Sequence, residues 1–463
     1  MNKKIIVLLM LLSVCKIVPA QISLSMQDAL RIATDNYESI KAKKNYLQAS
    51  EATEQTSKRE YLPDLRLSAQ QSYGTINAQN GPMYGFGGLG VASSSMPLDE
   101  QNWNAAFGSL YLANINWDFF TFGQISNNIN LSRLATERSK ADLQQEIFQH
   151  QIRTVSAYLN LLAIQRMVFV QQQNVNRAEV FLSTVQSLAD SELRPKVDAS
   201  LAQAEVSNAK ISLIKVLDKE LELSNVLAVL LGIEYTQFQL EDTFSKSSPA
   251  LLSSASEGSQ NHPSLLYKQS IIDHSNGQIK LLKSQNMPRF SLFGVLQGRG
   301  SGFEYNYVQD NSAFSRKYTD GVGIDRTNYL IGVGVTWNFT SLFRNRSKIK
   351  SQQFTSFALV DEYKLLENEL KAQSLMADGR ILNALDYKKE SPIQVKAATE
   401  AYQQHLALYK NGLTTIADLT QSFYSLNRAE TDNEIANINV WQALLLKASS
   451  VGDINLFTNE IEL

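Results

Sequence analysis

Hydrophobic periodicity first separates long helical segments from short strands. Residues 124–194 contain neither glycine nor proline. Within them Ile152, Val155, Leu159 and Leu162 recur at spacings of three and four, which is the period of a packed helical face. A helix of this length reaches about 100 Å at a rise of about 1.5 Å per residue. Uninterrupted helices of this kind favour coiled-coil packing.

A second helix is expected after a short turn in each half of the chain. Pro195 suits a helix start and Gly232 suits a helix end, which predicts a helix between them. The plan recurs later, with expected helices over residues 342–410 and 414–451 joined by an Asn-Gly turn. Each half is therefore predicted to contain one helical hairpin.

Two stretches in each half alternate with a period of two residues, as strands do. Tyr329, Ile331, Val333, Val335 and Trp337 share one face, opposed by glycine and polar residues. Aromatic residues at strand ends, with small polar residues opposite, favour strands of a barrel in lipid, although the alternation also fits a soluble sandwich. The strands are expected at about residues 65–74, 105–119, 289–300 and 328–339.

Landmarks of the first half recur in the second half in the same order, which indicates a duplication. The correspondences, at an offset of 220 or 225 positions, are residues 62–65 with 287–290, 117–119 with 337–339, and 193–198 with 413–418. A serine-rich stretch between the halves is typical of a linker. The expected organisation is a signal at residues 1–20, a first repeat at 21–240, a Ser-rich linker at 241–260, a second repeat at 261–455 and a C-terminal tail at 456–463.

The first 20 residues have the pattern of a secretory signal. A basic start precedes an apolar run at residues 5–14, and Ala20 offers a small-residue cleavage site. The run is too short to span a bilayer as a helix, which needs about 20 apolar residues. Residues 1–20 are therefore expected to be a signal peptide, with lipidation at Cys15, after the bulky Val14, as an open alternative.

Composition excludes several classes of function. Lys and Arg number 43 against 45 Asp and Glu, so no global basic field favours a nucleic-acid partner. The single cysteine lies in the expected signal, which excludes a disulfide framework and a catalytic thiol from the mature chain. The four histidines lack metal-binding spacing, and the glycine-rich residues 85–90 neither follow a buried parallel strand nor open a helix. We expect no enzymatic activity, cofactor or metal.

Four strands cannot close a barrel by themselves. Transmembrane barrels need about eight strands or more, and an open sheet edge cannot face hydrocarbon because its amides have no partner there. If these strands enter a bilayer, several copies must share one barrel. Two copies would give eight strands, whose interior fills with side chains, whereas three copies would give twelve strands and begin to leave a lumen. A trimer is therefore expected only if the protein conducts a substrate.

The sequence resembles the outer-membrane efflux protein family, the TolC-like channels, over the whole expected mature chain. No single sequence motif is specific to this family, but the motifs together, in this order and duplicated, are. The motifs are Leu24 to Leu30, Leu62-Pro63-Asp64-Leu65, Trp117 to Gly123, Tyr409-Lys410-Asn411-Gly412-Leu413 and Asp418.

The resemblance implies a mainly α fold with a β-barrel contribution. Duplicated long-helix hairpins would form a periplasmic α-barrel, and four transmembrane strands per protomer would close as a 12-stranded barrel in a homotrimer. The implied function is the exit duct of a tripartite efflux pump or type I secretion system in the outer membrane of a Gram-negative bacterium. Its implied partners are outer-membrane lipid, a periplasmic adaptor (membrane fusion) protein and an inner-membrane transporter, and it has no catalytic chemistry of its own.

The resemblance also implies a periplasmic gate at the tips of the hairpins. Asp198 and Tyr409 match positions of the family's lock, and Asp418 matches an inner acidic ring. Three symmetry-related carboxylates would make a negative throat that favours cations. Thr414 and Gln421 depart from the family pattern, which has an arginine and an acidic residue there. The alternative is that both aspartates merely favour the positive ends of their helices.

Glu192, Leu193, Gly412 and Leu413 occupy the tip positions where the family implies docking of the adaptor. The alternative for Gly412 is that it only ends a helix. For the whole chain, the alternative function is a secreted coiled-coil scaffold or adhesin without a pore. Such a protein would have the signal and the helices but no need for the paired amphipathic strands.

Overall fold

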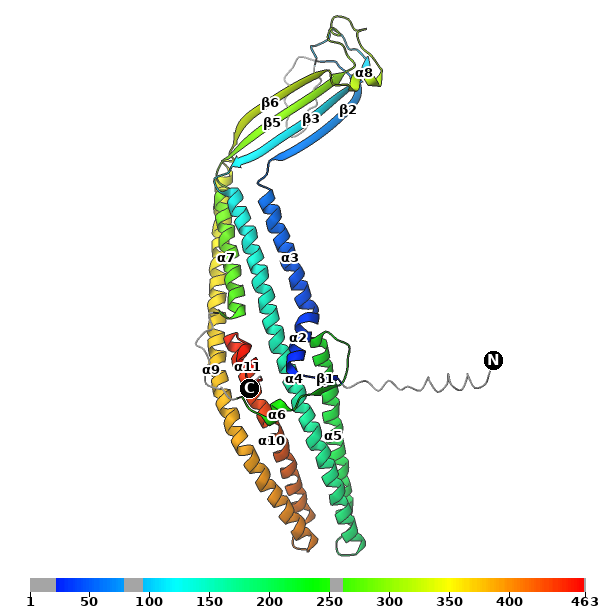
Figure 1. Cartoon of the computed structure of the whole chain (residues 1–463), viewed down its shortest axis with the longest axis vertical. Helices are drawn as coiled ribbons and strands as arrows, with labels where there is room; N and C mark the ends of the chain where they lie inside the picture. Colours follow the sequence, from blue (N-terminus) through cyan, green and yellow to red (C-terminus); the bar gives the residue numbers. More distant parts are fainter. Residues whose placement is uncertain (1–21, 79–94, 250–260, 462–463) are drawn as a thin grey trace, which may run out of the picture. The chain divides into compact units, whose positions relative to one another are not determined.

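The structure is a computed structural model that describes residues 22–78, 95–249 and 261–461 (Figure 1). The expected signal peptide with Cys15, the glycine-rich residues 85–90 and residues 250–260 of the expected linker lie outside the described residues. Among the helices that the structure describes, none combines the length and the apolar character needed to cross a bilayer.

The chain forms two compact units, and each of them takes segments from both halves of the sequence. The helical unit consists of the chain up to Ala49, Thr136–Asp273, and the chain from Phe357 onward. The sheet unit consists of Ser50–Ala135 and His274–Ser356. The two expected repeats are therefore interleaved in space, and their boundaries in the sequence stay a prediction.

A four-stranded antiparallel sheet dominates the sheet unit, in the order β2-β3-β5-β6 (Figure 1). The four strands that the sequence predicts are confirmed, with ends that differ by a few residues. They are β2 (Asp64–Thr75), β3 (Ala105–Phe120), β5 (Arg289–Ser301) and β6 (Arg326–Thr336). Because β2 and β6 each pair on one side only, both edges of the sheet keep a row of unpaired backbone groups.

Register gives the sheet one mainly apolar face and one face of mixed character. Leu65 pairs with Ile115, which pairs with Gly294, which pairs with Ile331, so these residues form one row across the sheet. The apolar face carries Leu65, Leu67, Ala113, Ile115, Leu292, Leu296, Tyr329, Ile331, Val333 and Val335. The other face is mixed: it carries Arg66, Ser68, Gln70, Ser72, Asn114, Asn116, Gln297 and Asn328 together with Leu110, Leu112, Phe293, Val295 and Leu330. Leu67 is 74% exposed and Ile331 is 72% exposed, so no described residue covers this part of the apolar face.

The same tryptophan contact closes both helix-to-strand turns of the sheet unit. The indole Nε1 of Trp117 donates to the carbonyl of Tyr61 at 2.9 Å. The indole Nε1 of Trp337 donates to the carbonyl of Asn286 at 3.0 Å. Each accepting residue lies two positions before a proline, so the two bonds are equivalent under the duplication.

The connection between β5 and β6 folds onto the apolar side of the sheet at its end. It contains the short helix α8 (Tyr318–Val322), whose last carbonyl accepts from the hydroxyls of Ser109 at 3.2 Å and Tyr111 at 3.1 Å. Gly321 permits this approach, because a Cβ there would lie 2.3 Å from the carbonyl oxygen of Phe107. The part of the connection that forms α8 therefore packs against β3.

Long helices make up most of the remaining chain, as the sequence predicts. They are α3 (Glu38–Arg59), α4 (Gln124–Asp190), α5 (Lys196–Leu231), α7 (Pro263–Ser284), α9 (Ser341–Lys410) and α10 (Ile416–Val451). In the helical unit, α4 with α5 and α9 with α10 form two hairpins (Figure 1). Shorter elements are β1 (Ile22–Leu24), α2 (Met26–Asn36), β4 (Phe238–Leu240), α6 (Thr243–Lys246) and α11 (Asn455–Thr458).

The main core of the helical unit packs α2, α4, α5 and α10 around two buried aromatic side chains. Tyr158 is fully buried, donates through its hydroxyl to the carbonyl of Leu24 at 2.9 Å and accepts from the amide of Glu241 at 3.2 Å. It thereby joins the two segments that carry the parallel pair β1 and β4. Trp441 is 1% exposed and donates to the carbonyl of Ser247 at 2.9 Å.

The beginning of the expected linker belongs to this core. Phe244, on α6, is fully buried and contacts Trp441 with ring centroids 5.0 Å apart. Asn437 on α10 donates to the carbonyl of Ser245 at 2.6 Å. Residues 243–248 therefore tie the two halves of the chain together, and the serine-rich composition alone did not indicate this contact.

A buried histidine lies at the start of α7. His262 is 3% exposed, and its Nδ1 accepts from the amide of Ser264 at 3.1 Å. Its Nε2 donates to the carbonyl of Ser449 at 3.0 Å, so the ring is neutral with the proton on Nε2. Burial lowers the pKa of His262, and the bond to Ser449 opposes this effect only in part.

Acid should therefore destabilise the helical unit through His262. Because the folded state disfavours the second proton, this stabilisation is present above the ordinary histidine pKa of 6.5 and is lost as the pH falls below it. Replacing His262→Asn should flatten the dependence of the unfolding midpoint on pH between about 7.5 and about 5.5. Thermal unfolding followed by circular dichroism measures both slopes, and equal slopes in His262→Asn and the unchanged chain would contradict this assignment.

Candidate functional site

The two hairpin turns have matching backbone structure. In the first, Glu192 adopts a φ of 58° and the amide of Leu193 donates to the carbonyl of Leu188 at 3.0 Å. In the second, Gly412 adopts a φ of 82° and the amide of Leu413 donates to the carbonyl of Leu408 at 2.9 Å. A residue in the left-handed region ends each helix, and only the second turn uses the glycine that this conformation favours.

The residues expected to dock an adaptor all lie at the exposed surface of these turns. Leu193 is 70% exposed and Leu413 is 73% exposed. Glu192 and Gly412 are exposed as well, and a Cβ on Gly412 would meet nothing within 4 Å. The tips thus present two large apolar side chains that nothing in the described chain covers.

Tyr409 and Asp198, the pair expected from the family's lock, are in direct contact between the two hairpins. The phenol of Tyr409 donates to Oδ2 of Asp198 at 2.7 Å. Tyr409 is fully buried and Asp198 is 8% exposed. Burial raises the pKa of Tyr409, and the bond to the carboxylate adds to the shift, so the phenol remains a donor throughout the physiological range.

Arg194 completes this contact, and the sequence reasoning did not identify it. Its guanidinium lies over the ring of Tyr409 with Cζ 4.3 Å from the centroid. It donates to the carbonyl of Tyr409 and, at 3.4 Å, to the carbonyl of Thr414. We call Arg194, Asp198 and Tyr409 the tip clasp, because these three side chains join the α4–α5 turn to the α9–α10 turn within one chain.

Arg194 contacts the residue that corresponds to it in the second hairpin, Thr414. The two residues are equivalent under the duplication, since Leu193 corresponds to Leu413. Here the arginine stands in the first hairpin and reaches the carbonyl of its own counterpart. The equivalence of positions 194 and 414 under the duplication could have pointed to Arg194 from the sequence alone.

Asp418 lies at the start of α10 and does not join the tip clasp. Its Oδ2 accepts from the Thr415 hydroxyl at 2.6 Å, the Thr415 amide at 3.2 Å and the Thr414 hydroxyl at 3.0 Å. The amide of Asp418 donates back to the Thr415 hydroxyl, which forms a capping box. These hydrogen bonds, from Thr415 first, lower the pKa of Asp418, so the exposed carboxylate carries its charge.

Behind the tip clasp, α4 and α10 are joined by partly buried ion pairs and an aromatic core. Arg177 places one nitrogen 2.7 Å and 2.6 Å from the two carboxylate oxygens of Glu430. Arg166 contacts Glu434 at 2.6 Å. The rings of Phe181 and Phe423 stack between these helices at 6.3 Å. The two hairpins therefore pack as one bundle over several turns.

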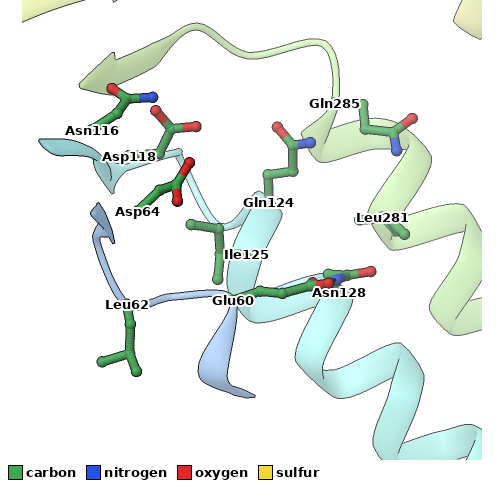
Figure 2. Close-up of a pocket in the computed structure, with 10 residues that line it drawn as sticks. All are labelled: Glu60, Leu62, Asp64, Asn116, Asp118, Gln124, Ile125, Asn128, Leu281 and Gln285. Atoms are coloured by element: carbon green, nitrogen blue, oxygen red, sulfur yellow. Dashed lines mark hydrogen bonds between the residues drawn. The ribbon is translucent and has the colours of Figure 1, made fainter. Parts of the chain in front are cut away.

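The sheet unit contains a separate polar cavity of about 360 Å³ where its helices meet the strands (Figure 2). Its carboxylates already have partners: Glu60 accepts from Asn128 at 3.4 Å, and Asp118 accepts from Ser291 at 2.5 Å. The third, Asp64, contacts Arg66 at 3.1 Å. No group of three or more potential metal ligands occurs in the part of the chain that the structure describes.

The comparisons with known proteins agree with this architecture. The family model described as outer membrane efflux protein matches residues 29–233. A search of curated proteins finds no match.

Solved structures of channel proteins superpose over nearly the whole chain. CusC, described with transmembrane channel formation, is 13% identical with a TM-score of 0.76, and the match covers 94% of this chain and 93% of CusC. The outer membrane protein VceC of Vibrio cholerae is 13% identical with a TM-score of 0.72, covering 92% and 96%. The CmeC outer membrane channel of Campylobacter jejuni is 12% identical with a TM-score of 0.74, covering 92% and 85%.

At these identities the solved structures establish the fold, namely long helical hairpins and four antiparallel strands. Residues 29–233 thus match the outer membrane efflux protein family, and the whole chain has the fold of solved outer-membrane channels.

Proposed function

We propose that the chain works as a homotrimer whose twelve strands close one barrel, and that this trimer is the exit duct of a tripartite pump or a type I secretion system. The observation that carries the proposal is the sheet with two unpaired edges and one exposed apolar face. Lipid offers no partner to unpaired amides, so β2 of one copy must pair with β6 of the next. Homologous efflux channels are trimeric, which supports the same number here.

Exposed apolar positions on the helices support contact between copies. On α5 they are Val197, Leu201, Ile211, Ile214, Leu221 and Val229, and on α9 they are Phe354, Leu365, Leu375, Leu382 and Ile393. Each is 46% exposed or more in the single chain. Several follow spacings of three, four or seven, as residues of a coiled-coil seam do. Neighbouring copies would remove this surface from water and close the α-barrel.

The tip clasp is proposed to hold the gate closed. It joins the two hairpin turns of one protomer through a buried tyrosine, an aspartate and an arginine. Opening requires the α9–α10 turn to separate from the α4–α5 turn, which would break these contacts together. Asp418 is proposed to line the throat as a ring of three carboxylates, since its capping role leaves the charge exposed.

Removing the phenol of Tyr409 should favour the open state. A buried hydrogen bond contributes about 1 kcal/mol, so Tyr409→Phe should raise the open-to-closed ratio about five-fold for each protomer. Single-channel recording of purified trimers in planar bilayers measures the open probability. Tyr402→Phe is the matched control, because Tyr402 lies two turns earlier on α9 and packs against Phe423. Equal open probabilities for Tyr409→Phe and the unchanged trimer would refute the gate.

Neutralising Asp418 should reduce cation preference. Asparagine keeps an oxygen that can cap α10, so Asp418→Asn removes the charge while leaving the fold of the turn intact. The reversal potential in a salt gradient should move toward zero in this variant and stay unchanged in Asp190→Asn. If both variants keep the original reversal potential, Asp418 does not line the conducting path.

The exposed tips are proposed to dock a periplasmic adaptor, which in turn engages an inner-membrane transporter. Leu193 and Leu413 supply equivalent apolar contacts, with Glu192 and Gly412 in the turns beside them. Apolar side chains gathered at an exposed surface mark sites of interaction with other proteins.

Placing a charge at the tip should prevent docking without dissociating the trimer. Leu413→Asp should abolish cross-linking to the adaptor and lower efflux, because a carboxylate would be desolvated in an apolar contact. Gln404→Asp, which adds the same charge to an exposed position on α9, should retain both. Cross-linking in cells, with trimer content measured on the same samples, checks the result, and unchanged cross-linking of Leu413→Asp would rule out docking at this turn.

A further inference from the structure

The start of α9 and the end of α7 concentrate basic side chains in a chain of nearly neutral charge. Arg344, Arg346, Lys348 and Lys350 fall within seven positions, and each is exposed. None of the four makes an ion pair with any residue that the structure describes. The net charge of the whole chain is −2, so this concentration of cations is local.

The neighbouring helix adds to the same surface. Helix α7 runs beside α9, because Asn345 donates to Asn286 at 2.8 Å and the hydroxyls of Ser275 and Ser356 lie 2.7 Å apart. Exposed Lys280 and Lys283 lie on α7 between these contacts, and no acidic residue occurs in residues 274–288 or 337–360. We call the six cations, with Arg344 to Lys350 on α9, the basic collar.

Aromatic side chains lie immediately next to the basic collar in the chain. Trp337, Phe339 and Phe343 are 52%, 56% and 71% exposed. Their rings make successive edge contacts, with centroids 5.3 Å apart for the first pair and 6.4 Å for the second. The bond from Trp337 to Asn286 fixes the first ring, so this exposed aromatic row has a defined structure.

The order of these surfaces matches the layers of a bilayer boundary. The apolar sheet face of β6, with Ile331, Val333 and Val335, comes first, the aromatic row follows, and the basic collar comes last. Barrel proteins place aromatic residues at the level of the headgroups. Basic side chains just beyond that level attract anionic lipids. Phe343, Arg346 and Lys350 recur at spacings of three and four, so two of the cations continue on the aromatic side of α9, whereas Arg344 and Lys348 lie on another side of the helix.

We propose that the basic collar binds the phosphate groups of anionic phospholipids in the membrane leaflet that faces the helices. The proposal rests on the outer-membrane channel function and adds a lipid partner of stated charge. Nucleic acid would meet the charge but would leave the adjoining aromatic row without a partner. The hydrocarbon and the phosphate of one phospholipid would satisfy both surfaces at once.

The test compares two variants of the full mature chain with the same change in charge. The collar variant carries Arg344→Gln, Arg346→Gln, Lys348→Gln and Lys350→Gln. The control carries Lys364→Gln, Lys371→Gln, Lys389→Gln and Lys396→Gln, all exposed positions further along α9. Trimers are reconstituted into nanodiscs containing phosphatidylglycerol and phosphatidylcholine, and native mass spectrometry counts the phosphatidylglycerol retained per trimer.

The collar variant should retain phosphatidylglycerol about ten-fold more weakly than the unchanged trimer, and the difference should shrink at high salt, whereas the control should bind normally. Equal retention by both variants would overturn the proposal. Loss of the trimer in the collar variant alone would also overturn it, because the collar would then be a contact between copies. Trimer mass and channel conductance, measured on the same samples, separate these outcomes from a failure of the channel function itself.

Discussion

The backbone hydrogen bonds at the two edges of the sheet are the constraint on which the rest of the structure depends. Four antiparallel strands satisfy one another internally, but β2 and β6 each keep one row of amides and carbonyls without a partner. In water such edges are tolerable, whereas in hydrocarbon each unpaired group costs several kcal/mol. Because one face of the sheet exposes apolar side chains, that face favours hydrocarbon over water. Sharing one barrel among copies resolves both problems, and the seams on α5 and α9 extend the same solution along the helices.

Duplication supplies equivalent parts, and the chain uses some of them symmetrically and others not. The bonds from Trp117 and Trp337 to backbone carbonyls are the same contact made twice. The hairpin turns share a backbone conformation but not their side chains. Arg194 has Thr414 as its counterpart and contacts that residue's carbonyl, so one arginine serves both turns. An asymmetric contact of this kind ties the hairpins together, as a gate that opens by separating them would need.

Much of the fold could be predicted from the sequence, because its elements are long and strongly patterned. The absence of glycine and proline from residues 124–190 predicted α4, and alternation before Trp337 predicted β6. The interleaving of the repeats into two units could not be predicted, since it depends on contacts distant in sequence. Phe244 illustrates this: its serine-rich surroundings indicated a linker, but burial against Trp441 places it in the core.

The candidate site was predicted only in part, for a related reason. Matching motifs pointed to Asp198 and Tyr409, and the structure places their side chains in contact. Arg194 was missed because its role depends on a turn that bends at Glu192 with a positive φ, which no local pattern indicates for a glutamate. For Asp418 the sequence left two roles open, and the capping box establishes one of them without excluding the other.

Hydrogen exchange of the edge-strand amides, combined with the mass of the purified particle, tests the central claim most directly. The account predicts particles of three chains in which the amides of β2 and β6 are protected as strongly as those of β3 and β5. A stable single chain whose β2 and β6 amides exchange freely would contradict it.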